Sequence, residues 1–102
     1  MSKPARRIGI VGYGKLGQHL CRSILSEPAL RHRFQLAFVW NLVPEDIGDE
    51  IPADLRLGEL DDFESRDADL IVEVAHPCIT WDYGTRFLAA ADYMTASATA
   101  FA

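Results

Sequence analysis

The sequence is poor in cysteine. Its two cysteines, Cys21 and Cys78, lie far apart in the chain and form no CxxC or CxxxC pair. A zinc or redox site built on them is therefore not supported, and no metal is expected. We expect each cysteine to be a small apolar residue in a protein of a reducing compartment.

The sequence also lacks a long apolar run. The basic segment from Met1 to Arg7 is followed only by the short apolar stretch from Ile8 to Val11, which Gly9 interrupts. This stretch is too short for the core of a signal peptide and far too short to cross a bilayer. The expected location is the cytoplasm, with no membrane partner.

An excess of positive charge is absent as well. The formal net charge is -5, and the arginines are dispersed along the chain. Arg6 and Arg7 precede the first expected strand, and Arg31 and Arg33 are expected in a loop. A nucleic-acid-binding protein normally shows a basic face, so the sequence does not favour such a partner.

The rest of the composition is that of one soluble globular domain. The chain has 102 residues, of which 49% are hydrophobic and 25% charged. It contains no internal repeat, low-complexity tract or long linker. A chain of this length fits a single domain, so residues 1–102 are expected to form one.

Apolar, β-branched stretches alternate with amphipathic ones along the chain. One helix is predicted from near Lys15 to a stop at Pro28, and a second from about Ile79 to Ala91. Their expected packing residues are Leu16, Leu20 and Ile24 in the first helix, and Tyr83, Phe87, Leu88 and Ala91 in the second. Strands are predicted at 8–11, 34–40, 69–75 and 93–97, a brief one at 55–57, and helical turns near 44–46 and 59–65. The alternation predicts a Rossmann-like, doubly wound parallel α/β sheet of about five strands in the order 3-2-1-4-5.

A GxGxxG motif, Gly12-Tyr13-Gly14-Lys15-Leu16-Gly17, joins the first predicted strand to the first predicted helix. The motif is weak alone, but here a buried strand precedes it, a helix follows it and a second strand lies at the right distance. Gly12 permits a tight turn, Gly14 lets a pyrophosphate approach the backbone, and Gly17 lets the helix pack closely. The free N–H groups at the helix start would face the phosphates. The motif thus predicts a dinucleotide, NAD or NADP, rather than a merely structural turn.

A second motif overlaps the first. Residues 9–15 match the first seven positions of a GxxxxGK phosphate loop, but Leu16 stands where Ser or Thr should hold magnesium. Gly9 also lies inside the predicted strand. The sequence therefore does not favour a nucleoside triphosphatase. Lys15 is expected either near the cofactor or in solvent.

The choice between NAD and NADP stays open. An acid after the second strand would hold the ribose 2′-hydroxyl of NAD, whereas an arginine would favour the 2′-phosphate of NADP. The sequence has Asn41 at this place and neither of those residues. Asn41 suits a hydroxyl or a phosphate oxygen, and it is equally suited to a turn.

Several segments together resemble the L-aspartate dehydrogenase family, closest to its animal branch of aspartate-dehydrogenase-domain proteins. The segments, which run in the family's order over nearly the whole chain, are 8–18, 38–41, 69–77 and 97–102. The stretch Val72-Glu73-Val74-Ala75-His76-Pro77 and the end around Ser97 are the more selective parts. One departure is Thr99 before Ala100-Phe101-Ala102, where the family often has Gly or Ser.

The resemblance implies oxidation of L-aspartate to iminoaspartate with NAD or NADP, linked to NAD synthesis. It also implies that Ala75, His76 and Pro77, and then Ser97 and Ala98, lie beside the cofactor. Family members carry catalytic groups in a second domain that binds substrate, and this chain looks like the cofactor half without it. The catalytic residues are therefore unknown.

Three residues have a second interpretation. His76 is expected to contact the cofactor rather than to act in acid–base catalysis, although His76-Pro77 could merely shape a turn. Glu73 is expected to brace the loops at the sheet edge, because a buried carboxylate needs partners. Ser97 either donates to the cofactor or caps the following segment, and the resemblance favours the former.

Two alternatives to an aspartate dehydrogenase remain. The chain could be a non-catalytic dinucleotide-binding or sensor module, or the cofactor half of another amino-acid or sugar dehydrogenase. An open sheet edge would also favour a homodimer or aggregation.

Overall fold

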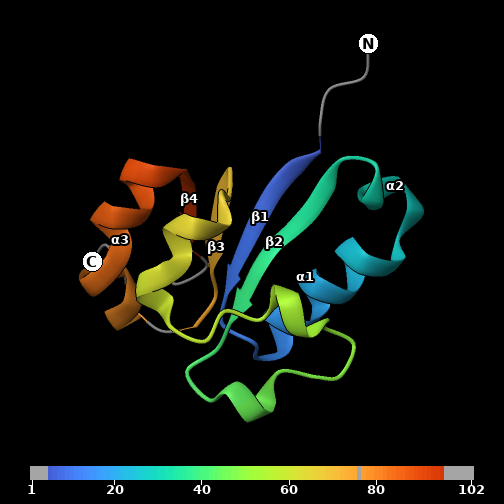
Figure 1. Cartoon of the computed structure of the whole chain (residues 1–102), viewed down its shortest axis with the longest axis horizontal. Coiled ribbons are helices and arrows are strands. Elements are labelled where there is room, and N and C mark those ends of the chain that lie inside the picture. Colours follow the sequence, from blue (N-terminus) through green and yellow to red (C-terminus); the bar gives the residue numbers. More distant parts are fainter. Residues whose placement is uncertain (1–4, 76, 96–102) are drawn as a thin grey trace.

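The computed structural model describes residues 5–75 and 77–95, which form one twisted parallel sheet with helices on both faces (Figure 1). The strands are β1 (Arg6–Val11), β2 (Phe34–Trp40), β3 (Leu70–Glu73) and β4 (Asp92–Thr95), in the order β2-β1-β3-β4. The helices are α1 (Lys15–Ser26), α2 (Pro28–Arg31) and α3 (Pro77–Ala90), and the 3-10 helices are η1 (Pro44–Asp46), η2 (Ala53–Leu55) and η3 (Leu60–Arg66). The predicted Rossmann-like α/β class is confirmed.

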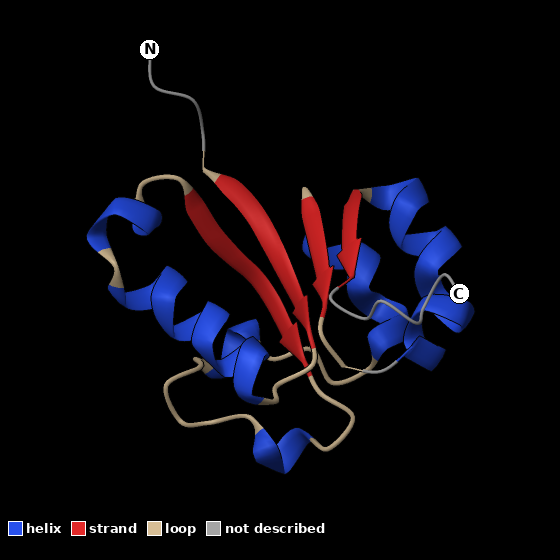
Figure 2. Cartoon of the chain, turned by 180° about the vertical axis from the view of Figure 1, so that it is seen from behind, coloured by secondary structure: helices blue, strands red, loops and turns tan. Residues whose placement is uncertain are grey.

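The two long helices cover different parts of the sheet. Figure 2 shows α1 on the side of β1 and β2, and α3 on the side of β3 and β4. The chain runs outward from β1 to β2 and then returns past β1 to β3. This reversal makes a topological switch point between β1 and β3, and ligands of open α/β sheets bind at the carboxyl ends of the strands there.

The prediction of a brief third strand at 55–57 is wrong. Arg56 forms only an isolated parallel bridge with Val39, and the N–H of Leu57 donates to Val39 O at 2.9 Å. The chain curls into η2 just before this point, so that one residue alone runs along β2. The described residues therefore form four strands instead of about five, although the bridge lies at the edge where the third strand was expected.

Several other boundaries differ from the predicted ones. The helix α3 begins at Pro77, two residues before the predicted start, and β4 begins at Asp92. Arg31 ends the short helix α2 and does not lie in a loop. Proline does stop α1 as predicted, and Pro28 then opens α2, because its fixed φ suits a first helical position.

The packing residues predicted for the two helices are confirmed except for one leucine in each: Leu20, Ile24, Tyr83, Phe87 and Ala91 lie in or against the core, whereas Leu16 and Leu88 do not. Gly17, Cys21 and Ile24 are the buried residues of α1, while Leu16 is 47% exposed. In α3, Phe87 is buried and Leu88 is 63% exposed. Gly17 has no side chain and lets α1 pack closely at that position, and Leu16, one residue before it, faces outward.

A β-bulge fits β2 onto β1. Ile8 pairs with Leu36 and Gly9 pairs with Phe38, so that Ala37 is the extra residue. A Cβ on Gly9 would lie 2.2 Å from the ring of Phe38. Gly9 is thus a strand glycine whose place is fixed by packing, which agrees with the rejection of the triphosphatase motif.

Candidate functional site

The first glycine of the motif forms a turn that only glycine adopts readily. Gly12 has φ of 115°, in the region that L side chains rarely occupy. A Cβ there would lie 2.8 Å from the nitrogen of Ala75, and the Gly12 N–H donates to Trp40 O at 2.7 Å. The turn therefore packs against the ends of both neighbouring strands, and it brings the motif beside Ala75.

The other two glycines have opposite surroundings. A Cβ on Gly17 would lie 2.2 Å from the carbonyl oxygen of Gly12, so that α1 packs directly on the turn. A Cβ on Gly14 would have no atom within 4 Å. Gly17 is needed by the protein's own packing, whereas the packing leaves open space beside Gly14.

The start of α1 has no side-chain cap. Gly14 is the N-cap residue, and the first main-chain helical bond runs from the Gln18 N–H to Gly14 O at 2.9 Å. The first N–H groups of a helix have no acceptor within the helix, and they carry its positive dipole end. Lys15 and Leu16 are exposed beside these N–H groups. The arrangement suits an anionic group that approaches over Gly14.

Asn41 joins the end of β2 to the glycine motif. Its Oδ1 accepts the Tyr13 N–H at 2.9 Å, and its Nδ2 donates to Val43 O at 2.9 Å. The sequence left open whether Asn41 contacts the cofactor or forms a turn. These two hydrogen bonds show that it shapes the turn after β2. One N–H of its amide is not used by these two bonds.

The side chain of Tyr13 points into the protein. Tyr13 is 2% exposed, and its hydroxyl donates to Glu50, which also pairs with Arg22 at 3.3 Å. Burial, followed by the bond to Glu50, raises the pKa of Tyr13 to about 12. The same bond is the largest cause that lowers the pKa of Glu50, which is therefore ionised at neutral pH. Tyr13 thus has a structural role: its side chain ties the glycine motif to Glu50.

A buried carboxylate lies at the end of β3. Glu73 is fully buried; one of its oxygens accepts the Ala75 N–H and the other accepts the Thr95 hydroxyl at 2.9 Å. The prediction that Glu73 braces the loops at this edge is confirmed by these bonds. They fix the backbone of Ala75, which lies against Gly12.

The structure brings together part of the predicted cofactor site. The glycine motif, Asn41 and Ala75 meet at the carboxyl ends of β1, β2 and β3. Pro77 is the first residue of α3. The predictions for His76, Ser97 and Ala98 lie outside the described residues.

Glu50 was not predicted from the sequence. It lies nine residues beyond Asn41 in an acidic stretch with no periodicity, and nothing in its neighbourhood marks it as the partner of Tyr13. A tyrosine inside a glycine motif was the one available signal, because a buried phenol needs a polar partner.

The part of the chain that the structure describes has neither a cluster of metal ligands nor a helix suited to a membrane. No group of three or more His, Cys, Asp or Glu residues there is placed to hold a metal ion. No helix in the same part has the length and apolarity needed to cross a membrane.

Comparison with known proteins identifies the family of this chain. Residues 12–102 match the family model described as homoserine dehydrogenase, NAD binding domain. Two curated relatives, from Danio rerio and Xenopus tropicalis, are both named aspartate dehydrogenase domain-containing protein and are both 48% identical to this chain. The matches cover 98% and 100% of this chain but 36% of each relative, so the chain spans about a third of their length.

These matches confirm the resemblance found in the sequence and its expected cofactor class. The glycine turn, the uncapped start of α1 and the family match agree on the same ligand. The chain therefore belongs to the family of homoserine dehydrogenase-type NAD-binding domains, and it is an NAD(P)-binding domain of a dehydrogenase family.

Proposed function

We propose that this chain is the cofactor-binding half of an L-aspartate dehydrogenase. The observation that carries the cofactor part is the open space over Gly14 at the uncapped start of α1. A pyrophosphate needs this combination of close backbone approach and free N–H groups. The substrate part is supported by the names of the two relatives and by the resemblance of residues 69–77.

Each part of the site would have its own task. The N–H groups of Gly14, Lys15 and Leu16 would hold the pyrophosphate, and the Lys15 ammonium group would add positive charge. Asn41 would contact the adenine-side ribose through its remaining N–H. By resemblance, segment 75–77 together with Ser97 and Ala98 would line the nicotinamide side.

In this proposal the chemistry belongs to the cofactor and to the additional segment that the longer relatives carry. When bound, the nicotinamide ring supplies the hydride acceptor for oxidation of L-aspartate to iminoaspartate, which hydrolyses to oxaloacetate and ammonia or enters NAD synthesis. This chain's residues bind and orient the ring, and Glu73 holds the backbone of Ala75 in place for that purpose. Groups that act on the substrate are proposed to lie in the additional segment of the longer relatives.

Two measurements test this proposal. Titration of residues 1–102 with NADH and NADPH, followed by nicotinamide fluorescence, should show saturable binding of at least one of them. Addition of L-aspartate and NAD⁺ or NADP⁺ to this chain should give no reduction. The same assay on a polypeptide that also carries the segment present in the relatives should give aspartate-dependent reduction. Binding without turnover in that longer polypeptide would favour the non-catalytic module instead.

We further propose that the chain self-associates through an apolar groove. The groove, of about 450 Å³, lies beside α1 over the face of β3 and β4 that α3 does not cover. It is lined in part by Ile8, Leu20, Leu70, Val72, Val74 and Met94. Sedimentation equilibrium of the wild-type chain should show dimers. The variant Met94→Glu should be monomeric, because it places a charge in the apolar groove. A chain that stays monomeric at the highest concentration would contradict this proposal.

A further inference from the structure

The segment from Asn41 to Glu50 is fastened to the glycine motif at both ends. At its start, Asn41 Oδ1 accepts the Tyr13 N–H at 2.9 Å, and at its end Glu50 accepts the Tyr13 hydroxyl. In Figure 1 this segment lies below the arrowheads of β1 and β2, at the same end of the sheet as the start of α1. The residues between these two anchors are therefore held beside the motif.

Arg56, which follows the segment in the chain, holds the end of the segment by hydrogen bonds. Its Nη2 donates to Gly48 O at 2.8 Å and its Nε donates to Ile51 O at 3.1 Å. Arg56 is thus engaged with backbone carbonyl groups. These two bonds of its guanidinium group stabilise the shape of the chain at the end of the segment.

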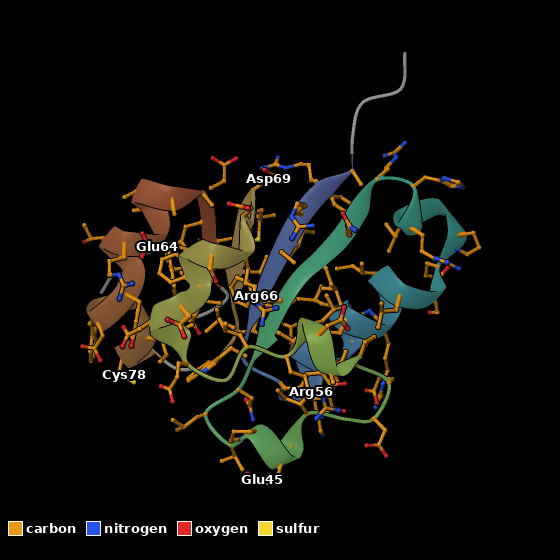
Figure 3. All side chains as sticks on the ribbon, viewed as in Figure 1. Glu45, Arg56, Glu64, Arg66, Asp69 and Cys78 are labelled. Atoms are coloured by element: carbon orange, nitrogen blue, oxygen red, sulfur yellow. The ribbon has the colours of Figure 1, made fainter. Side chains whose placement is uncertain are left out.

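The segment carries charge of one sign. Residues 41–50 contain Glu45, Asp46, Asp49 and Glu50 and no lysine, arginine or histidine. Glu45 lies at the end of the molecule toward which the strands point (Figure 3). The neighbouring cation on α1, Arg22, is paired with Glu50 at 3.3 Å. The four carboxylates outnumber the two guanidinium groups that contact the segment, Arg22 and Arg56, so its net charge is negative.

This charge bears on the choice between the two dinucleotides. In a Rossmann-like site the residue after the second strand lies near the 2′ position of the adenine-side ribose, and an arginine there accommodates the 2′-phosphate. Here Asn41 occupies that place, with its Oδ1 already used by Tyr13. Its remaining N–H can donate to a ribose hydroxyl but carries no charge to neutralise a phosphate monoester, which bears about -1.5 to -2 at pH 7.

We infer that the segment from Asn41 to Glu50 selects NAD over NADP by repelling the 2′-phosphate. The inference rests on the proposed cofactor site, and it adds the cofactor preference that the sequence left open. A negative segment anchored beside the ribose disfavours the additional phosphate, whereas the pyrophosphate common to both dinucleotides is held by α1. The repulsion is electrostatic, so it weakens as salt screens it.

The first test compares NADH with NADPH on residues 1–102 by fluorescence titration at low and at high salt. NADPH should bind about tenfold more weakly at low salt, and the ratio should shrink at high salt. Equal binding, or tighter binding of NADPH, would overturn the inference and leave the proposed function standing. Failure of both dinucleotides to bind would overturn the proposed function and this inference with it.

A matched pair of variants tests the mechanism. Asp46→Lys reverses an exposed charge inside the segment, and Glu27→Lys makes the same change at the other end of α1. The ratio of NADPH to NADH affinity should rise several-fold in Asp46→Lys and stay unchanged in Glu27→Lys. The same ratio in both variants would contradict the role of this segment, even if NADH binds preferentially. Far-ultraviolet circular dichroism of both variants establishes that the fold is kept.

Discussion

Asn41 Oδ1 accepts the N–H of Tyr13 at 2.9 Å, so the residue that follows β2 holds the second residue of the glycine motif. This bond fixes the turn before α1 relative to the end of β2. The geometry that positions the candidate pyrophosphate site therefore depends on a side chain 28 residues along the chain.

The glycines of the motif should differ in their effect on stability. Gly17→Ala places a Cβ 2.2 Å from a backbone carbonyl oxygen, so the free energy of unfolding should fall by about 2 kcal/mol, even after the gain in helix propensity. Gly14→Ala meets open space and should change it by less than about 0.5 kcal/mol. Urea denaturation of both variants measures the difference, and equal values would contradict the described packing.

Glu73 should be essential for the edge of the sheet. Glu73→Ala leaves the Ala75 N–H and the Thr95 hydroxyl without this acceptor, and the expected loss is about 2 to 4 kcal/mol of unfolding free energy. Glu73→Gln keeps one acceptor oxygen and should lose less. The measurement is chemical denaturation of the three proteins. A loss below about 0.5 kcal/mol in the alanine variant would show that these bonds do not hold the edge.

The two cysteines should differ in reactivity. Cys21 is fully buried in α1, and burial raises the pKa of its thiol to about 12, while Cys78 is partly exposed on α3. A thiol reagent added near pH 8 should therefore label Cys78 quickly and Cys21 only after unfolding. Mass spectrometry of the labelled peptides identifies the site. Early labelling of Cys21 would contradict its burial.

Stability should fall at alkaline pH. Tyr13 and Cys21 both have folded-state pKa values of about 12, above their ordinary values of 10.0 and 9.0. The unfolded chain loses these protons first, so their contribution to stability is complete below about pH 9 and is lost as the pH rises toward 12. Urea midpoints measured across this range should fall, and Tyr13→Phe should flatten the fall. A midpoint independent of pH would contradict both shifts.

The order of elements could be predicted because each depends on local pattern. The apolar run of β1 and the glycine motif determine where the first strand ends and α1 begins. Periodicity placed Leu20, Ile24 and Phe87 correctly on the packed faces of the helices, but it did not show that Leu16, beside the close contact at Gly17, is exposed. The prediction of a third strand at 55–57 was wrong because the pairing of these residues depends on how the preceding segment folds, and Arg56 holds that segment through its hydrogen bonds.

The candidate site also contains some features that could be predicted from the sequence and one that could not. The meeting of the motif with Asn41 could be predicted because both follow strands of a parallel sheet, whereas Ala75 was expected from the family resemblance. The link between Tyr13 and Glu50 was missed because it joins two residues whose contact depends on the path of a long irregular segment. That path is set by tertiary contacts, which leave no periodic signal.

Calorimetric titration with NADH of the wild-type chain and two glycine variants tests the central claim most directly. Gly14 and Gly58 both have open space at the position of a Cβ, but only Gly14 lies at the start of α1. Gly58→Leu should bind NADH as the wild type does, and Gly14→Leu should bind about a hundredfold more weakly, equal to about 2.7 kcal/mol. Wild-type affinity in Gly14→Leu would contradict the placement of the pyrophosphate over this glycine.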